Sequence, residues 1–174
     1  MKHMIRILTM LILLSSAAAA NDLSGYGVSL GYGPSKDDID IYRIGLLKAW
    51  DVRWLENPTG CVTGYFEVSY NRWEADGETT NGVAFSPVLQ YTFNTRISQF
   101  HPYVEGGIGI AYIDDYVIKN RNLSSNLHFE DRIGAGIRFR HLDLNFRYLH
   151  YSNASLKEPN DGIDIFMGTL SWYF

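Results

Sequence analysis

The chain has 174 residues, enough for one domain, and 46% of them are hydrophobic and 14% aromatic. This composition excludes a disordered chain, because apolar and aromatic side chains at this density need burial or a membrane interface. The formal net charge of −4 argues against a surface that follows nucleic-acid phosphates, and a single cysteine, Cys61, cannot form an intramolecular disulfide.

The first twenty residues have the features of a secretory signal peptide. Basic side chains precede the apolar run Ile7–Leu14, and small residues at 15–20 resemble a signal-peptidase site. The apolar run is too short to span a bilayer. We therefore predict a cleaved signal peptide over residues 1–20 and a mature domain over residues 21–174.

From Gly25 onward, apolar residues alternate with polar or very small ones at a period of two, which is typical of β-strands with one apolar face. In one segment, Leu127 and Phe129 share a face, and Glu130 and Arg132 share the other. Eight such segments are predicted, at about 25–32, 39–54, 61–74, 83–93, 103–113, 127–139, 142–152 and 163–174. An even number of strands of this length indicates a small transmembrane outer-membrane β-barrel, all-β and antiparallel. The alternative, a soluble lipocalin-type barrel, would point its apolar side chains inward.

The predicted connections alternate in length. Longer ones follow the odd-numbered segments, at Pro34–Asp38, Ala75–Asn81, Asp114–Asn126 and Asn153–Gly162. Shorter ones lie at Leu55–Gly60, Thr95–His101 and Arg140–His141. Because short turns face the periplasm in such barrels, the longer loops are predicted to be extracellular.

The parity of each segment predicts its two faces. The final segment ends at Phe174 in an aromatic run resembling the terminal signature of outer-membrane barrels, and its even-numbered positions should face lipid. The opposite faces should form a packed polar lumen, containing Glu67, Glu105, Glu130, Arg132, Arg138, Asp143 and Arg147.

A histidine and a serine continue the lipid-facing row of the seventh segment. The row runs from Leu142 to Tyr148, and its next members, at the extracellular end, are His150 and Ser152. A position at the membrane interface alone would account for them, because polar groups cost little there. The alternative is nucleophilic catalysis, since an i, i+2 pair on one strand places an imidazole and a hydroxyl on the same face.

A catalytic triad also needs a carboxylate that orients the imidazole. Asp164, near the start of the last segment, has the lipid-facing parity. In a register that sets it opposite His150, the two Cβ atoms would lie about 4.5–5.5 Å apart. Glu158 is the rival acid, although its loop position favours ordinary solvation.

The stretch from His150 to Asp164 resembles the active-site segment of the lipid A 3-O-deacylase (PagL) family, whose members are eight-stranded outer-membrane barrels. The family's His-x-Ser-Asn falls on His150, Ser152 and Asn153, and its Pro-Asn before a Gly falls on Pro159, Asn160 and Gly162. The triad acid of the family, ordinarily Glu, falls on Asp164. This shorter side chain implies a shifted strand register or a longer contact between the imidazole and the acid.

The resemblance implies hydrolysis of the 3-hydroxyacyl ester at position 3 of lipid A, in the outer membrane of a Gram-negative bacterium. Ser152 would attack the carbonyl, and His150 would act as base and then as acid. Asn153, loop backbone N–H groups and Asn160 would stabilise the oxyanion. Lys157 would meet a lipid A phosphate, unless it is simply solvated.

No cofactor is expected, and no nucleic-acid partner. His101, His128 and His141 lack a shared metal-ligand spacing, so no metal site is predicted. Two other functions stay open: a non-enzymatic structural or adhesive barrel, and acyl transfer between lipids instead of hydrolysis.

Overall fold

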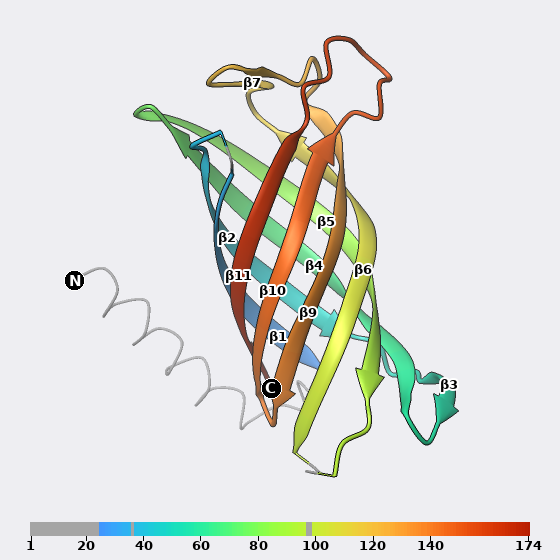
Figure 1. The fold of residues 1–174 in the computed structure, drawn as a ribbon. Helices are drawn as coiled ribbons and strands as arrows, with labels where there is room; N and C mark the ends of the chain where they lie inside the picture. Colours follow the sequence, from blue (N-terminus) through green and yellow to red (C-terminus); the bar gives the residue numbers. More distant parts are fainter. Residues whose placement is uncertain (1–24, 36, 97–98) are drawn as a thin grey trace, which may run out of the picture.

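Antiparallel strands follow one another around the molecule and close into a barrel (Figure 1). The computed structural model describes residues 25–35, 37–96 and 99–174, so the predicted signal peptide lies outside the described residues. In the described part, the barrel strands are β1 (Tyr26–Pro34), β2 (Asp40–Ala49), β4 (Gly60–Ala75), β5 (Glu78–Phe93), β6 (Phe100–Ile113), β9 (Leu127–Phe139), β10 (Leu142–Ser152) and β11 (Ile163–Tyr173). β1 pairs with both β2 and β11, and β2 pairs with β4, so these eight strands have no free edge. The predicted fold class is confirmed.

The second predicted segment is divided in the structure. β2 ends at Ala49, and a separate short strand, β3 (Trp54–Asn57), pairs with the beginning of β4. The expectation of one strand over 39–54 was therefore wrong. Just after β2, the Trp50 ring packs against Phe66 of β4, at 5.3 Å between ring centroids.

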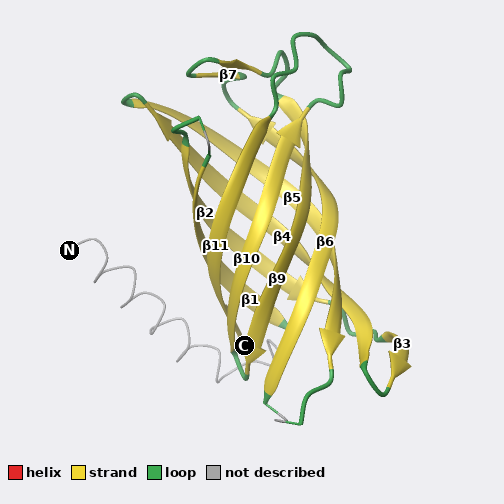
Figure 2. Ribbon diagram, in the orientation of Figure 1, coloured by secondary structure: helices red, strands yellow, loops and turns green. Residues whose placement is uncertain are grey.

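The prediction of a longer connection at Ala75–Asn81 was wrong, and the connection at Asp114–Asn126 contains two short strands. β4 and β5 are joined by Asp76 and Gly77 alone, both with positive φ, as in the tight hairpin turns that Asp-Gly favours. The connection after β6 contains a hairpin of its own, β7 (Val117–Ile118) and β8 (Arg121–Asn122). This hairpin lies with the longer loops at one end of the barrel, and β3 lies at the other (Figures 1 and 2).

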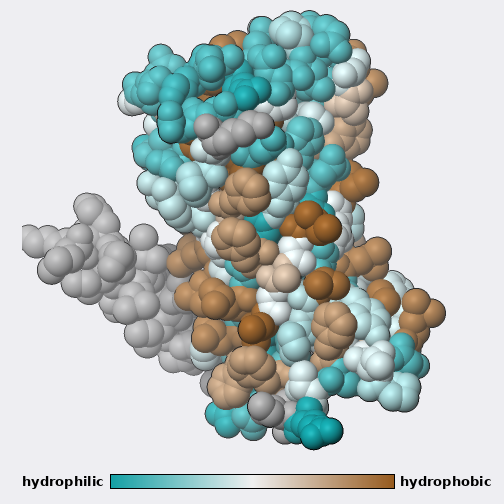
Figure 3. Space-filling view, viewed as in Figure 1, coloured by the Kyte–Doolittle hydropathy of each residue, from teal (hydrophilic) through white to brown (hydrophobic). Residues whose placement is uncertain are grey.

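The outer wall is apolar, as the parity of the segments predicts. On β10, Leu144 is 62% exposed and Phe146 61%, whereas the alternate residues Asn145 and Arg147 are buried. The space-filling view shows hydrophobic side chains gathered on the wall below a hydrophilic cap over the loops (Figure 3). No helix in residues 25–35, 37–96 and 99–174 is long and apolar enough to cross a membrane.

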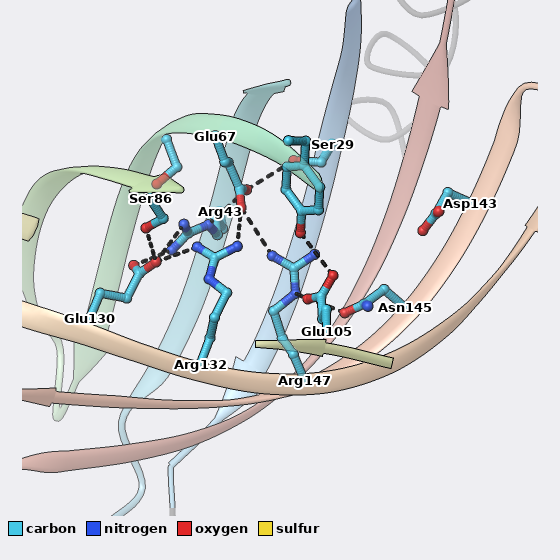
Figure 4. Close-up of polar contacts among 12 residues, drawn as sticks. Ser29, Arg43, Glu67, Ser86, Glu105, Glu130, Arg132, Asp143, Asn145 and Arg147 are labelled. Atoms are coloured by element: carbon cyan, nitrogen blue, oxygen red, sulfur yellow. Dashed lines mark hydrogen bonds and ion pairs between the residues drawn. The ribbon is translucent and has the colours of Figure 1, made fainter. Parts of the chain in front are cut away.

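The middle of the lumen is filled by ion pairs (Figure 4). Arg43 contacts Glu67 at 3.2 Å and Glu130 at 2.7 Å, and Arg132 contacts Glu67 at 2.5 Å, all with fully buried side chains. Arg147 reaches Glu67 at 3.1 Å and Glu105 at 3.4 Å. Three arginines thus face three glutamates, which offsets much of the cost of burying each charge.

The lumen is not polar throughout, which corrects the prediction from parity. Toward the loop end it holds a cluster of buried apolar side chains, namely Ile39, Ile41, Trp73, Ala75, Ala84, Ala111, Ile113, Ile118, Leu123, Leu149, Tyr151, Ile163, Ile165 and Met167. This cluster lies directly behind the ends of β10 and β11 that carry His150 and Asp164. Close packing there gives the outer-wall residues a rigid support.

Candidate functional site

The row of polar residues on the outer wall is formed by β10 and β11. His150 is the direct register partner of Asp164, as expected from parity. His150 Nδ1 lies 2.6 Å from Asp164 Oδ1, with side chains 37% and 25% exposed. The shorter acid therefore reaches the imidazole in direct register, and of the two alternatives drawn from the sequence, the longer contact is not observed.

Ser152 is the last residue of β10, on the same face as His150. In the described part of the chain, His150 is hydrogen-bonded to Asp164 and not to Ser152. Because Asp164 holds Nδ1, the other ring nitrogen, Nε2, is the one that can accept a proton from a nearby hydroxyl. The structure thus joins the imidazole to the acid and places the serine one strand period further along.

The chain turns sharply just after the serine. Ala154 and Ser155 are consecutive residues with positive φ, at 53° and 57°. Residues other than glycine seldom adopt a positive φ. Backbone strain of this kind is concentrated at functional sites. Leu156 N–H donates to the Asn153 carbonyl at 3.1 Å and closes the turn.

Asn153 and Asn160, the expected oxyanion donors, lie together but play different parts. The Asn153 backbone N–H donates to Asn160 Oδ1 at 3.1 Å, so the two residues are joined across the loop. The Asn153 side chain is buried and donates to the carbonyls of Leu123 and Lys157, each at 2.8 Å. Its amide therefore fixes the loop, whereas the Asn160 side chain is half-buried.

The β7–β8 hairpin holds the loop that contains these residues. Arg121 Nη1 donates to the Asp161 carbonyl at 3.0 Å, and Asn122 N–H donates to Asp161 Oδ2 at 2.7 Å. Arg121 Nη2 also donates to Asp37 Oδ1 at 2.7 Å, and this hydrogen bond raises the pKa of the Arg121 guanidinium. Three connections far apart in the sequence are thus tied together above the site.

The loop ends at Gly162, which lies against the His150 ring. Gly162 has φ of +59°, and a Cβ at this position would lie 3.0 Å from His150 Cε1. Any side chain there would press on the imidazole. The Gly162 in the family motif therefore has a physical role in this chain, which is to leave room for the ring.

Two residues of the site were missed by the sequence reasoning. Tyr148 donates its hydroxyl to Asp164 Oδ1 at 2.6 Å. Asp131 is the register partner of His150 on β9, on the side of β10 opposite Asp164. The parity of the 127–139 segment already placed Asp131 on the lipid-facing row, so this signal was present in the sequence.

The remaining candidates lie away from the imidazole. Glu158 is exposed in the loop, and the structure brings Asp164 to His150 instead. Lys157 is also exposed, with Nζ 6.0 Å from the centre of the Tyr116 ring. Across the described ranges, no group of three or more His, Cys, Asp or Glu residues could hold a metal ion.

Comparison with known proteins gives consistent matches. Residues 41–173 match the family described as Lipid A 3-O-deacylase (PagL). Lipid A deacylase PagL of Pseudomonas aeruginosa is 39% identical over 160 residues, which cover 90% of this chain and 91% of that protein. Lipid A deacylase PagL of Bordetella bronchiseptica is 30% identical over 113 residues, covering 62% and 61%. A crystal structure of the outer membrane enzyme PagL matches with a TM-score of 0.80 and 37% identity, covering 85% of this chain and 99% of that one.

Proposed function

This chain belongs to the lipid A 3-O-deacylase (PagL) family, and on that premise we propose that it is a serine esterase that removes the 3-hydroxyacyl chain from position 3 of lipid A. The catalytic residues in this proposal are Ser152, His150 and Asp164. The observation that carries it is the hydrogen bond from His150 Nδ1 to Asp164 Oδ1 on the lipid-facing wall of an outer-membrane barrel.

The position of the row suits a substrate that stays in the membrane. Lipid A occupies the outer leaflet of the outer membrane, so its ester carbonyls lie at the height of the extracellular barrel end. His150 and Ser152 are at that end of β10, beside the loop at 153–162. A nucleophile inside the lumen would not meet this substrate, because ion pairs and packed apolar side chains fill the interior.

The wall below the row offers a place for an acyl chain. Phe146 is flanked in register by Ala135 on one side and Gly168 on the other, so the wall is shallow beside its ring. These three residues line a largely apolar groove of about 510 Å³. Phe146 precedes His150 by four residues on the strand, or about 13 Å. A chain esterified at the row would point down the apolar outer wall of β10, toward Phe146 and the centre of the bilayer.

The proposed reaction uses these groups in two stages. Ser152 Oγ attacks the ester carbonyl while His150 Nε2 accepts its proton, and Asp164 stabilises the imidazolium that forms. The Asn160 amide and loop N–H groups donate to the oxyanion. Collapse expels the sugar hydroxyl, which takes the proton from His150. Water then attacks the acyl-enzyme, again with His150 as base, and the hydroxy fatty acid leaves.

Mass spectrometry of lipid A tests the proposal. Cells that produce the wild-type chain should contain lipid A that lacks one 3-hydroxyacyl chain, and cells with the folded Ser152→Ala variant should not. Gain of an acyl chain would indicate acyl transfer between lipids. Unchanged lipid A in both would favour a structural or adhesive barrel and would overturn the proposal.

A further inference from the structure

Tyr148 contacts the same carboxylate oxygen as the catalytic histidine of the proposed triad. Its hydroxyl donates to Asp164 Oδ1 at 2.6 Å, and His150 Nδ1 lies 2.6 Å from that oxygen. Both donors come from β10, two residues apart on one face, and the acceptor comes from β11. The carboxylate is therefore fixed from two directions at a single atom.

The packing of the wall does not require this hydroxyl. The Tyr148 ring lies against its register partner Phe166, with centroids 5.4 Å apart and a tilt of 54°. A phenylalanine ring would make the same contact. The lipid-facing residues earlier on β10, among them Leu144 and Phe146, carry no polar group. The Tyr148 hydroxyl therefore serves the hydrogen bond to Asp164 and not the packing of the ring. A hydroxyl that is buried or faces lipid needs a hydrogen-bond acceptor.

The charged groups around the His150 imidazole bear on the hydrogen bond from Tyr148 to Asp164. His150 has Asp164 on β11 as one register partner and Asp131 on β9 as the other. The Arg121 guanidinium of β8 also interacts electrostatically with Asp164. Of these two carboxylates, Asp164 is the one whose oxygen lies within hydrogen-bond distance of His150 Nδ1. A second donor on the same oxygen keeps that carboxylate at Nδ1 and so keeps the imidazole in one orientation.

We propose that Tyr148 is a positioning residue for the acid of the triad: its hydroxyl holds the Asp164 carboxylate toward His150. This inference rests on the proposed function. It assigns to Tyr148 an effect on the rate of the chemical step, with no part in binding the substrate.

Kinetics of purified variants on lipid A in detergent test this role. Tyr148→Phe should lower kcat about 10- to 100-fold and leave KM unchanged, since a hydrogen bond to a charged group is lost while the ring remains. Tyr70→Phe is the matched control, because the Tyr70 hydroxyl donates to Asn81 Oδ1 at 2.6 Å on the outer wall of β4. It should have wild-type activity.

A double-mutant cycle separates positioning from a general loss of structure. In the Asp164→Asn background, Tyr148→Phe should cause little further loss, because the charge that it serves is already absent. An unchanged kcat for Tyr148→Phe, or an equal loss in both backgrounds, would overturn the inference while leaving the triad intact. An inactive wild-type enzyme would instead overturn the proposed function, and this inference with it.

Discussion

His150 and Asp164 face each other directly across β10 and β11, with Nδ1 and Oδ1 2.6 Å apart on the outside of the barrel. If this pair operates in catalysis, Asp164→Asn should keep the shape of the acid but lose the charge that stabilises the imidazolium. In soluble triads the corresponding loss is about 10⁴-fold. We expect a decrease of several orders of magnitude in the initial rate of lipid A deacylation.

Two further variants define the role of the acid. Asp164→Glu should retain much more activity than Asp164→Asn, because the charge is kept. Glu158→Gln should have nearly the wild-type rate, since Glu158 is exposed in the loop. A silent Asp164→Asn together with a severe Glu158→Gln would remove Asp164 from the triad.

Gly162→Ala tests whether the imidazole needs the space that the glycine leaves. The added Cβ would lie 3.0 Å from His150 Cε1, so the ring must move. A shift of about 1 Å in a catalytic group can reduce the rate about 10²-fold. The displacement required here is only a few tenths of an ångström, so we expect a smaller decrease in kcat, measured on lipid A in detergent.

Gly77→Ala is the control for backbone strain. Gly77 also has a positive φ, of +84°, but a Cβ there would meet nothing within 4 Å. This variant should lose some stability, as Gly162→Ala should, and keep its activity. Equal activities for the two variants would show that the imidazole does not need the space beside Gly162.

Arg121→Ala tests the contribution of the β7–β8 hairpin to the site. The variant loses the hydrogen bonds to the Asp161 carbonyl and to Asp37, so the loop at 153–162 is held less firmly. Each such bond contributes about 0.5–1.5 kcal/mol. We expect kcat to fall about 3- to 10-fold and the loop to be cleaved faster in limited proteolysis.

Lys119→Ala is the matched control on the same hairpin. Lys119 pairs with Asp38 and Asp76, at 3.5 and 3.6 Å, and not with the loop at 153–162. Its removal should leave kcat near the wild-type value. If Arg121→Ala and Lys119→Ala behave alike, the hairpin does not position the site through Asp161.

Glu130→Gln tests the buried ion pairs of the lumen. Glu130 contacts Arg43, Arg132 and the hydroxyls of Ser86 and Tyr151, and its side chain is fully buried. Removing one partner of a buried pair typically costs about 3–5 kcal/mol, because the remaining charges are uncompensated. Urea unfolding of the barrel in detergent should show a decrease of this size in the free energy of unfolding.

Glu56→Gln gives the comparison at the surface. The pair between Arg53 and Glu56 spans 2.7 Å, but the side chains are 59% and 61% exposed. Such pairs contribute about 0–1 kcal/mol. A Glu130→Gln variant as stable as Glu56→Gln would mean that the buried network adds little to the stability of the barrel.

The strands and the row of polar residues on the outer wall could be predicted from the alternation of apolar and polar residues in the sequence. The alternation on β9, β10 and β11 gave the two faces of each strand, and the parity of His150, Ser152 and Asp164 put them in one row. Parity does not determine what fills the lumen. Leu149 and Tyr151 are buried in an apolar cluster. The charged residues that precede them on the lumen face of β10 predicted a polar lumen instead.

Other features depend on contacts that a sequence pattern does not contain. The two-residue strands β7 and β8 are too short to show a period, and their pairing with the loop near Asp161 is made by individual hydrogen bonds. The shared oxygen between Tyr148 and His150 depends on side-chain torsions on two strands. Asp131 differs from these, because its parity already placed it on the lipid-facing wall.

The rate of 3-hydroxyacyl release by the folded Ser152→Ala barrel tests the central claim most directly. Ser152 is at the outer end of β10, away from the buried ion pairs, so the variant should fold like the wild type. On purified lipid A in detergent, we predict an initial rate at least ~10³-fold below that of the wild type, with His150→Ala equally impaired. A folded Ser152→Ala protein that releases the chain at nearly the wild-type rate would contradict the account.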